Sequence, residues 1–124
     1  VSVQRRGEAV VAAEHLEAIR ARWGPLYVSS AYRSPQLNAL IGGSPTSAHM
    51  QGYAADVVPL AKGVSILEVL LWVRNDSGLV FDQVIDERGA GPTGWLHYAY
   101  AHEAHPTPRR QCLRMRHGIY SRIA

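Results

Sequence analysis

Cysteine is nearly absent from this chain of 124 residues, because Cys112 is the only one. Closed structural zinc sites bind their metal through four ligands, and these usually include several thiolates. A single thiol cannot meet that requirement. The residue count therefore excludes a thiolate-rich structural metal site.

Long apolar runs are also missing from the sequence. No stretch of about eighteen apolar residues occurs, so we expect no membrane-spanning helix. The amino terminus lacks the basic and then apolar pattern of a secretory signal. We therefore expect the protein to be exported by another route or to have lost a leader segment.

The balance of charge is basic, with a net charge of +3. Five arginines crowd the end of the chain: Arg109, Arg110, Arg114, Arg116 and Arg122. Such a segment favours anionic partners, among them cell-wall polymers and nucleic acids, although the arginines of a solvated helix can also pair locally. We expect no nucleic-acid partner, because no helix-turn-helix, zinc-finger spacing or basic strand interleaved with aromatic residues occurs.

Hydrophobic periodicity predicts two long helices. Ala9–Trp23 carries apolar residues at every third or fourth position, and Gly24 followed by proline ends the pattern. Ser65–Val73 begins with a serine N-cap and has Glu68 at the capping-box position. Two shorter helices are expected at Ser34–Leu40 and Arg109–His117.

Four segments are expected to be strands: Leu26–Tyr32, Ala54–Val58, Phe81–Glu87 and Trp95–Tyr100. A loop rich in glycine joins the last two, which favours an antiparallel hairpin. The length and the 47% hydrophobic content suit one domain, residues 1–124, with one core. We therefore predict a small α+β domain with a central antiparallel sheet and flanking helices.

One motif carries most of the chemical information. It runs from Ser47 to Asp56 with the sequence SAHMQGYAAD, and a Trp-Leu-His segment ending at His97 follows some forty residues later. Two imidazoles and one carboxylate suit a catalytic zinc, because three protein ligands leave a fourth position free. We predict a zinc site in a cleft on the sheet, with His49, Asp56 and His97 as ligands.

The joint pattern S-x-H-x-x-G-x-A-x-D and W-x-H resembles the zinc D-alanyl-D-alanine carboxypeptidases and L-alanyl-D-glutamate endopeptidases that cut peptidoglycan stem peptides. The segment Ser30–Asn38 with the later Gly-Gly pair is similar to a second block of that family. The resemblance covers about Leu26 to Tyr100, and the segment PRRQCLR after it matches the arginine-bearing tail of a compact, phage-associated branch. It implies an enzyme of the endolysin or carboxypeptidase type that acts at the cell wall or in the periplasm and is phage-encoded or carried in a virion. It also implies a monomer, unless the chain forms part of a virion.

The same resemblance implies roles for further residues. Arg33 would face the zinc and hold a substrate carboxylate or the developing oxyanion. Ser47 is expected either to donate a hydrogen bond to substrate or to stabilise its loop. Zinc would polarise the scissile carbonyl and lower the pKa of its water.

At the position of the general base, this sequence differs from the better-known members of the family. They carry an acidic residue where this chain has Gly94. A symmetric hairpin register places Glu87 opposite Trp95 and on the face of His97, which favours Glu87 as the base. A slip of one residue would favour Asp86 instead, and the base can also be absent. Gln83 shares the face of Glu87, so it is a candidate for binding substrate or water, or a solvent-facing strand residue.

Two other functions compete with peptidoglycan hydrolysis. A domain that has kept zinc and lost its base would be a non-catalytic wall-binding or virion module. A zinc enzyme could also act on another amide or a small dipeptide.

Overall fold

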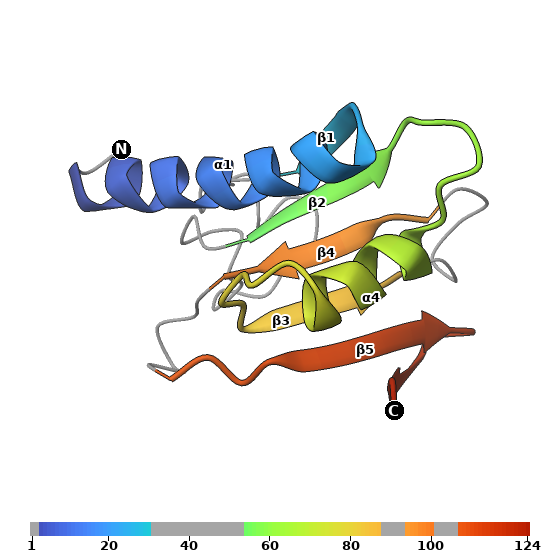
Figure 1. Cartoon of the computed structure of the whole chain (residues 1–124). Coiled ribbons are helices and arrows are strands. Elements are labelled where there is room, and N and C mark those ends of the chain that lie inside the picture. Colours follow the sequence, from blue (N-terminus) through green and yellow to red (C-terminus); the bar gives the residue numbers. More distant parts are fainter. Residues whose placement is uncertain (1–2, 31–53, 88–93, 101–106) are drawn as a thin grey trace.

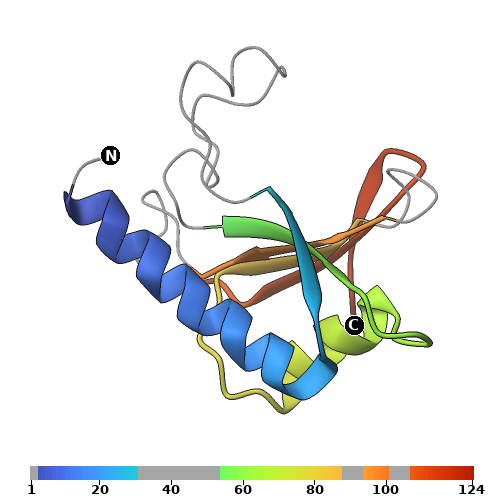
Figure 2. The same cartoon turned by 90° about the horizontal axis from the view of Figure 1, so that it is seen from above.

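The computed structural model describes residues 3–30, 54–87, 94–100 and 107–124. Within them lie helices α1 (Val3–Trp23) and α4 (Ile66–Asn75). The strands are β1 (Leu26–Ser30), β2 (Ala54–Pro59), β3 (Gln83–Asp86), β4 (Leu96–Ala99), β5 (Gln111–Arg116) and β6 (Ile119–Arg122). These strands form one sheet in the order β1-β2-β4-β3-β5-β6, and both helices lie on the same face of it (Figures 1 and 2).

The predicted α+β class is confirmed, but the sheet is mixed. Strands β3 and β5 run parallel, whereas every other neighbouring pair in the described sheet is antiparallel. The reason lies at the start of β3, where the backbone N–H of Gln111 donates to the carbonyl of Asp82 at 2.9 Å. Strand β5 therefore starts beside the start of β3 and runs in the same direction.

Helix α4 begins as the sequence predicts. The Ser65 hydroxyl accepts from the backbone N–H of Glu68 at 3.1 Å, and the Glu68 carboxylate accepts from the backbone N–H of Ser65 at 3.1 Å. This capping box satisfies two N–H groups that would otherwise lack partners. The helix ends at Asn75, two residues beyond the predicted bound.

The core lies between the helices and the sheet. Helix α4 contributes Val69, Leu70 and Val73, all at most 1% exposed. The facing sheet residues are Ala55, Val57, Val84, Leu96, Tyr98 and Cys112. Since strand side chains alternate, these positions define the helix-covered face and leave their neighbours on the other face.

The predicted helix Arg109–His117 is wrong, because this segment forms strand β5 and the turn that follows it. His117 and Gly118 both have positive φ, at 53° and 75°, and connect Arg116 to its partner Ile119. Two residues with positive φ are the geometry of a type I′ hairpin turn. Since side chains alternate along a strand, Arg114 and Arg116 of β5 lie on one face of the sheet, the face that carries Asp86.

The remaining bounds differ by a few residues. Helix α1 starts at Val3 instead of Ala9, strand β2 extends one residue further than predicted, and β3 and β4 are shorter than predicted at both ends. The predicted end of the first strand, residues 31–32, lies outside the described residues. The predicted helix Ser34–Leu40 lies outside the described residues. No described helix has the length and apolar character required to span a membrane.

Candidate functional site

The face of the sheet turned away from the helices carries two of the three predicted zinc ligands. Asp56 of β2 and His97 of β4 are direct partners in the antiparallel register. Their Oδ1 and Nδ1 atoms lie 3.0 Å apart, and their side chains are 16% and 13% exposed. The structure thus brings together two residues that are 41 positions apart in the sequence.

This pair has the chemistry of a partial metal site. A carboxylate oxygen and an imidazole nitrogen that approach so closely require a proton or a cation between them. Two ligands of a tetrahedral zinc, bound at about 2.0–2.2 Å, lie roughly 3.3–3.5 Å apart. The observed 3.0 Å separation is that of a hydrogen bond, and it is within a few tenths of an ångström of the spacing that two zinc ligands require. The two side chains are therefore placed so that both could bind one zinc ion.

The third predicted ligand, His49, lies outside the described residues, as do Arg33 and Ser47. Within residues 3–30, 54–87, 94–100 and 107–124, no three His, Cys, Asp or Glu side chains gather as a metal site. A complete zinc site would therefore have to take a ligand from beyond these ranges.

The hairpin register places Glu87 where the sequence predicts. The backbone N–H of Glu87 donates to the carbonyl of Trp95 at 2.9 Å, and Ile85 pairs with His97. Alternation along β3 and β4 then puts Glu87 on the face of His97. Gly94 has a φ of +55°, a conformation in which an acidic side chain would be strained, so its backbone favours glycine.

Asp86 lies on the opposite, helix-covered face. It is 1% exposed, and its Oδ2 accepts from Nη2 of Arg116 at 2.9 Å. Burial with a guanidinium partner is the environment of a structural carboxylate.

Tyr120 is a neighbour of Glu87 that the sequence did not reveal. Its hydroxyl donates to Oε1 of Glu87 at 2.7 Å. This hydrogen bond, followed by burial and the charges of Glu87 and Asp56, raises the pKa of Tyr120 to about 12. Tyr120 therefore remains protonated, and a donor, throughout the neutral pH range.

Gln83 faces the same way, and its amide is engaged. Its Nε2 donates to Oε1 of Gln111 at 2.7 Å. Because β3 and β5 pair Gln83 with Gln111 in parallel register, the two amides lie side by side on this face of the sheet.

His15 of α1 contacts the sheet through two tyrosines. Its Nδ1 lies 2.5 Å from the Tyr98 hydroxyl, and its ring also stands 5.4 Å from the ring of Tyr100. Burial lowers the pKa of His15, although the charge of Glu14 opposes this effect. Burial also raises the pKa of Tyr98.

Comparison with known proteins agrees with the geometry. A model of the family described as Peptidase M15 matches residues 1–83, which is 83 of the 124 residues. The matched part includes Asp56 and ends before Glu87 and His97. Comparison with curated proteins gives no match. The paired Asp56 and His97, together with a match over about two thirds of the chain, show that it belongs to the peptidase M15 family, whose members are metallopeptidases that generally depend on zinc.

Proposed function

We propose that the protein hydrolyses peptide bonds in peptidoglycan stem peptides, with zinc held by His49, Asp56 and His97. The observation that carries this proposal is the Asp56–His97 pair at 3.0 Å on the face away from the helices. Membership of the M15 family supports a peptidoglycan substrate and action at the cell wall.

Each remaining site residue has a distinct task in this proposal. Zinc, when bound, polarises a carbonyl and makes water a nucleophile near neutral pH. Glu87 accepts a proton from the attacking water and returns it to the leaving amine. Tyr120 holds one oxygen of Glu87 by its 2.7 Å hydrogen bond, which orients the other oxygen.

Substrate binding is assigned to Arg33, Ser47 and Gln83. The fork of Arg33 pairs with a substrate carboxylate or with the oxyanion that forms during attack. Gln83 already donates one amide hydrogen to Gln111, and its carbonyl oxygen is the group we assign to substrate contact. Ser47, two positions before His49 in the sequence, donates a hydrogen bond to substrate in this proposal.

The deciding experiment is an assay on purified peptidoglycan, with native, chelated and zinc-restored protein. We expect new amino groups with native protein, none after chelation, and recovery with zinc. Free D-alanine among the products would identify a carboxypeptidase, and a new amino-terminal glutamate would identify an endopeptidase. A protein that binds zinc and wall fragments but releases no amine from them would be a binding module, and the proposal would fail.

A further inference from the structure

Tyr27 of the edge strand β1 lies on the same face of the sheet as Asp56 and His97. It is the register partner of Val58, which comes two residues after Asp56 and so projects from the same face. Leu26, the neighbour of Tyr27 in β1, packs against the core on the opposite face. Neither described helix lies over the face that carries Tyr27 (Figures 1 and 2).

The Tyr27 ring is close to the proposed metal site and open to a ligand. Tyr27 stands diagonally across from Asp56 in the β1–β2 pair, and such neighbours are about 7–8 Å apart, within reach of an aromatic side chain. The side chain of Tyr27 is 59% exposed. Tyrosine presents a large, rigid and amphipathic surface at a low cost in conformational entropy. Tyr27 therefore has the position and the chemistry of a substrate platform.

The order of the strands places Tyr27 and Glu87 on opposite sides of the metal pair. Asp56 on β2 and His97 on β4 lie between Tyr27 on β1 and Glu87, which directly follows β3. In the proposed function, Glu87 returns a proton to the leaving amine, so that amine lies toward β3. The acyl part of the substrate, which carries the attacked carbonyl, then extends toward Tyr27.

The two candidate bonds put different groups on this acyl side. The stem peptides of peptidoglycan begin with L-alanine, whose amino end is attached to a sugar of the glycan strand, and they end in D-alanine. When the L-Ala–D-Glu bond is cut, a sugar lies one residue before the attacked carbonyl. The D-Ala–D-Ala bond is three residues farther along, which moves the sugar roughly 10 Å away. Only the first cut brings a sugar to Tyr27.

A sugar ring also suits Tyr27 better than the stem peptide does. A pyranose presents several C–H groups on one face, and these pack against the electron-rich face of an aromatic ring. The methyl group of alanine and the carboxylate of D-glutamate offer no broad apolar surface of this kind. The exposed ring therefore favours a sugar on the acyl side.

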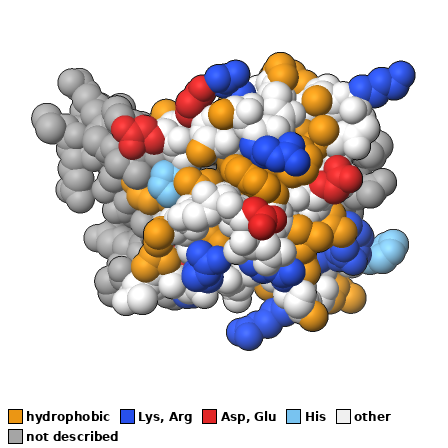
Figure 3. Space-filling view, viewed as in Figure 1, with side chains coloured by type: hydrophobic (Ala, Val, Ile, Leu, Met, Phe, Trp, Pro, Cys, Tyr) orange, Lys and Arg blue, Asp and Glu red, His pale blue; other side chains and the backbone are white. Residues whose placement is uncertain are grey.

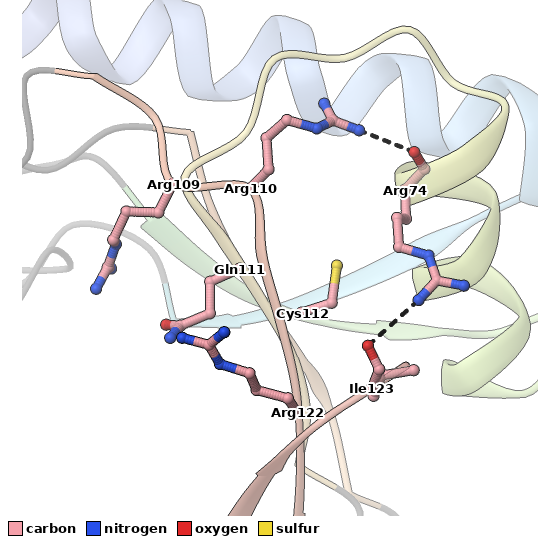
Figure 4. Close-up of a pocket in the computed structure, with 7 residues that line it drawn as sticks. All are labelled: Arg74, Arg109, Arg110, Gln111, Cys112, Arg122 and Ile123. Carbon is pink, nitrogen blue, oxygen red and sulfur yellow. Dashed lines mark hydrogen bonds between the residues drawn. The ribbon is translucent and has the colours of Figure 1, made fainter.

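The hollow beside the end of α4 has a structural role instead. It has a volume of about 330 Å³, and four arginines line it (Figure 4). Arg109 donates to both oxygens of Asp82 at 3.1 and 2.8 Å, and Arg110 and Arg74 donate to the carbonyls of Arg74 and Ala124 at 2.9 Å each. These contacts join α4 to β5 and β6. On the helix side of the molecule, acidic, basic and hydrophobic side chains are interspersed (Figure 3).

We propose that Tyr27 stacks on the sugar that precedes the stem peptide, and that the bond cut is L-Ala–D-Glu. This inference rests on the proposed function and gives the direction in which the substrate lies on the sheet. The sugar lies toward β1 and the leaving amine lies toward β3.

The test compares two substrates with the zinc-loaded protein: a disaccharide tetrapeptide released from peptidoglycan by a muramidase, and the same tetrapeptide without sugars. A third probe, the disaccharide without peptide, has no bond to be cut, and its Kd is measured by calorimetry. Tyr27→Thr removes the ring and keeps a residue that favours strands. Tyr27→Phe keeps the ring.

Ile119→Ala is the matched control for loss of exposed apolar surface. Ile119 is 69% exposed, and it pairs with Arg116, which lies on the face opposite to Tyr27. Thermal denaturation of each variant shows whether the fold is kept.

We expect the KM of the disaccharide tetrapeptide to be about three- to tenfold lower than that of the free tetrapeptide, the effect of one aromatic contact. Tyr27→Thr should remove this difference by raising the first KM alone, and it should weaken binding of the disaccharide. Tyr27→Phe and Ile119→Ala should keep both values. The products should carry a new amino-terminal glutamate.

Several results would overturn the inference and leave the proposed function standing. They are equal KM values for the two substrates, an equal effect of Tyr27→Thr on both, or release of D-alanine alone. An equal loss in Tyr27→Phe and Tyr27→Thr would replace stacking by a hydroxyl contact. If neither substrate is cut, the proposed function fails and the assignment of the bond fails with it. The Kd of the disaccharide then decides the sugar contact, which is rejected if Tyr27→Thr leaves it unchanged.

Discussion

Asp56 and His97 lie close together because they sit opposite each other on adjacent antiparallel strands. Directly opposed residues have Cβ atoms about 4.5–5.5 Å apart, so rigid backbone already sets most of the distance between two metal ligands. Ala54 and Ala99, the next pair on the same face, are small. On this side of Asp56 and His97, the two strands therefore carry only methyl side chains.

Glu87→Gln is the first residue-scale prediction. Glutamine keeps the size and the hydrogen bond to Tyr120 but cannot accept the proton. We expect turnover of peptidoglycan fragments to fall about a hundredfold to ten-thousandfold, the usual contribution of positioned proton transfer. Zinc content, measured by elemental analysis, should not change.

Asp86→Asn is the control for that variant, because Asp86 lies on the helix-covered face. We expect it to lower stability through loss of the Arg116 ion pair and to leave turnover of the folded protein nearly unchanged. Collapse of turnover in the Asp86 variant, with normal turnover in the Glu87 variant, would contradict the assignment of the base.

Tyr120→Phe tests the positioning of Glu87. The variant keeps the ring and removes the donor, so the carboxylate gains freedom to rotate. We expect kcat to fall about three- to tenfold, in keeping with one hydrogen bond, while KM and zinc content stay the same. Tyr27→Phe, on edge strand β1 at the far side of the sheet, is the matched control. An equal effect in both variants would refute a specific role for Tyr120.

At the scale of elements, His15 connects α1 to β4 through Tyr98. Burial lowers the pKa of His15 below its ordinary value of 6.5, so the folded protein favours the neutral ring. The unfolded chain takes up a proton more readily as the pH falls through 6.5. The stabilisation from neutral His15 is therefore complete above that pH and is lost below it.

His15→Gln should weaken the dependence of stability on pH. The measurement is urea denaturation at several values between pH 7 and pH 5. Over this range we expect the urea midpoint of the wild type to fall more steeply than that of the variant. His117→Asn is the control, because His117 is exposed in the β5–β6 turn and asparagine tolerates its positive φ. Parallel pH profiles for wild type and His15→Gln would contradict the prediction.

The elements that the sequence predicted well carry local signals. Helix α4 has its capping box, and the β3–β4 register follows from the loop between two short strands. The predicted helix Arg109–His117 was wrong, because Gln111–Arg116 forms strand β5. Its place beside β3 depends on the long-range contact of Arg109 with Asp82, which no local pattern reveals.

At the scale of the whole molecule, the parts of the site that follow from local sequence signals could be predicted, and the parts that depend on contacts between distant segments could not. The pairing of Asp56 with His97 agrees with a motif visible in the sequence. The approach of Tyr120 to Glu87 depends on the parallel step from β3 to β5 and on the hairpin after it. A reader of the sequence who expected a helix there could not place Tyr120 near the site.

The last prediction concerns zinc and the stability of the fold. The proposed ligands come from positions 49, 56 and 97, so an unfolded chain does not hold them together. Zinc should therefore bind the native state preferentially and raise Tm. At free zinc about one hundred times the Kd, the stabilisation is about 2.7 kcal/mol, or roughly 10 °C for a domain of this size.

Thermal denaturation with zinc and with a chelator measures this shift. His97→Ala and His49→Ala should each abolish most of it, whereas His117→Asn should keep it in full. The two ligand variants separate two parts of the proposal. Loss of the shift in His97→Ala alone would confirm the ligand on the sheet and reject His49 as its partner. Retention of the shift in both would mean that zinc binds elsewhere, and the close approach of Asp56 to His97 would then be an ordinary hydrogen bond.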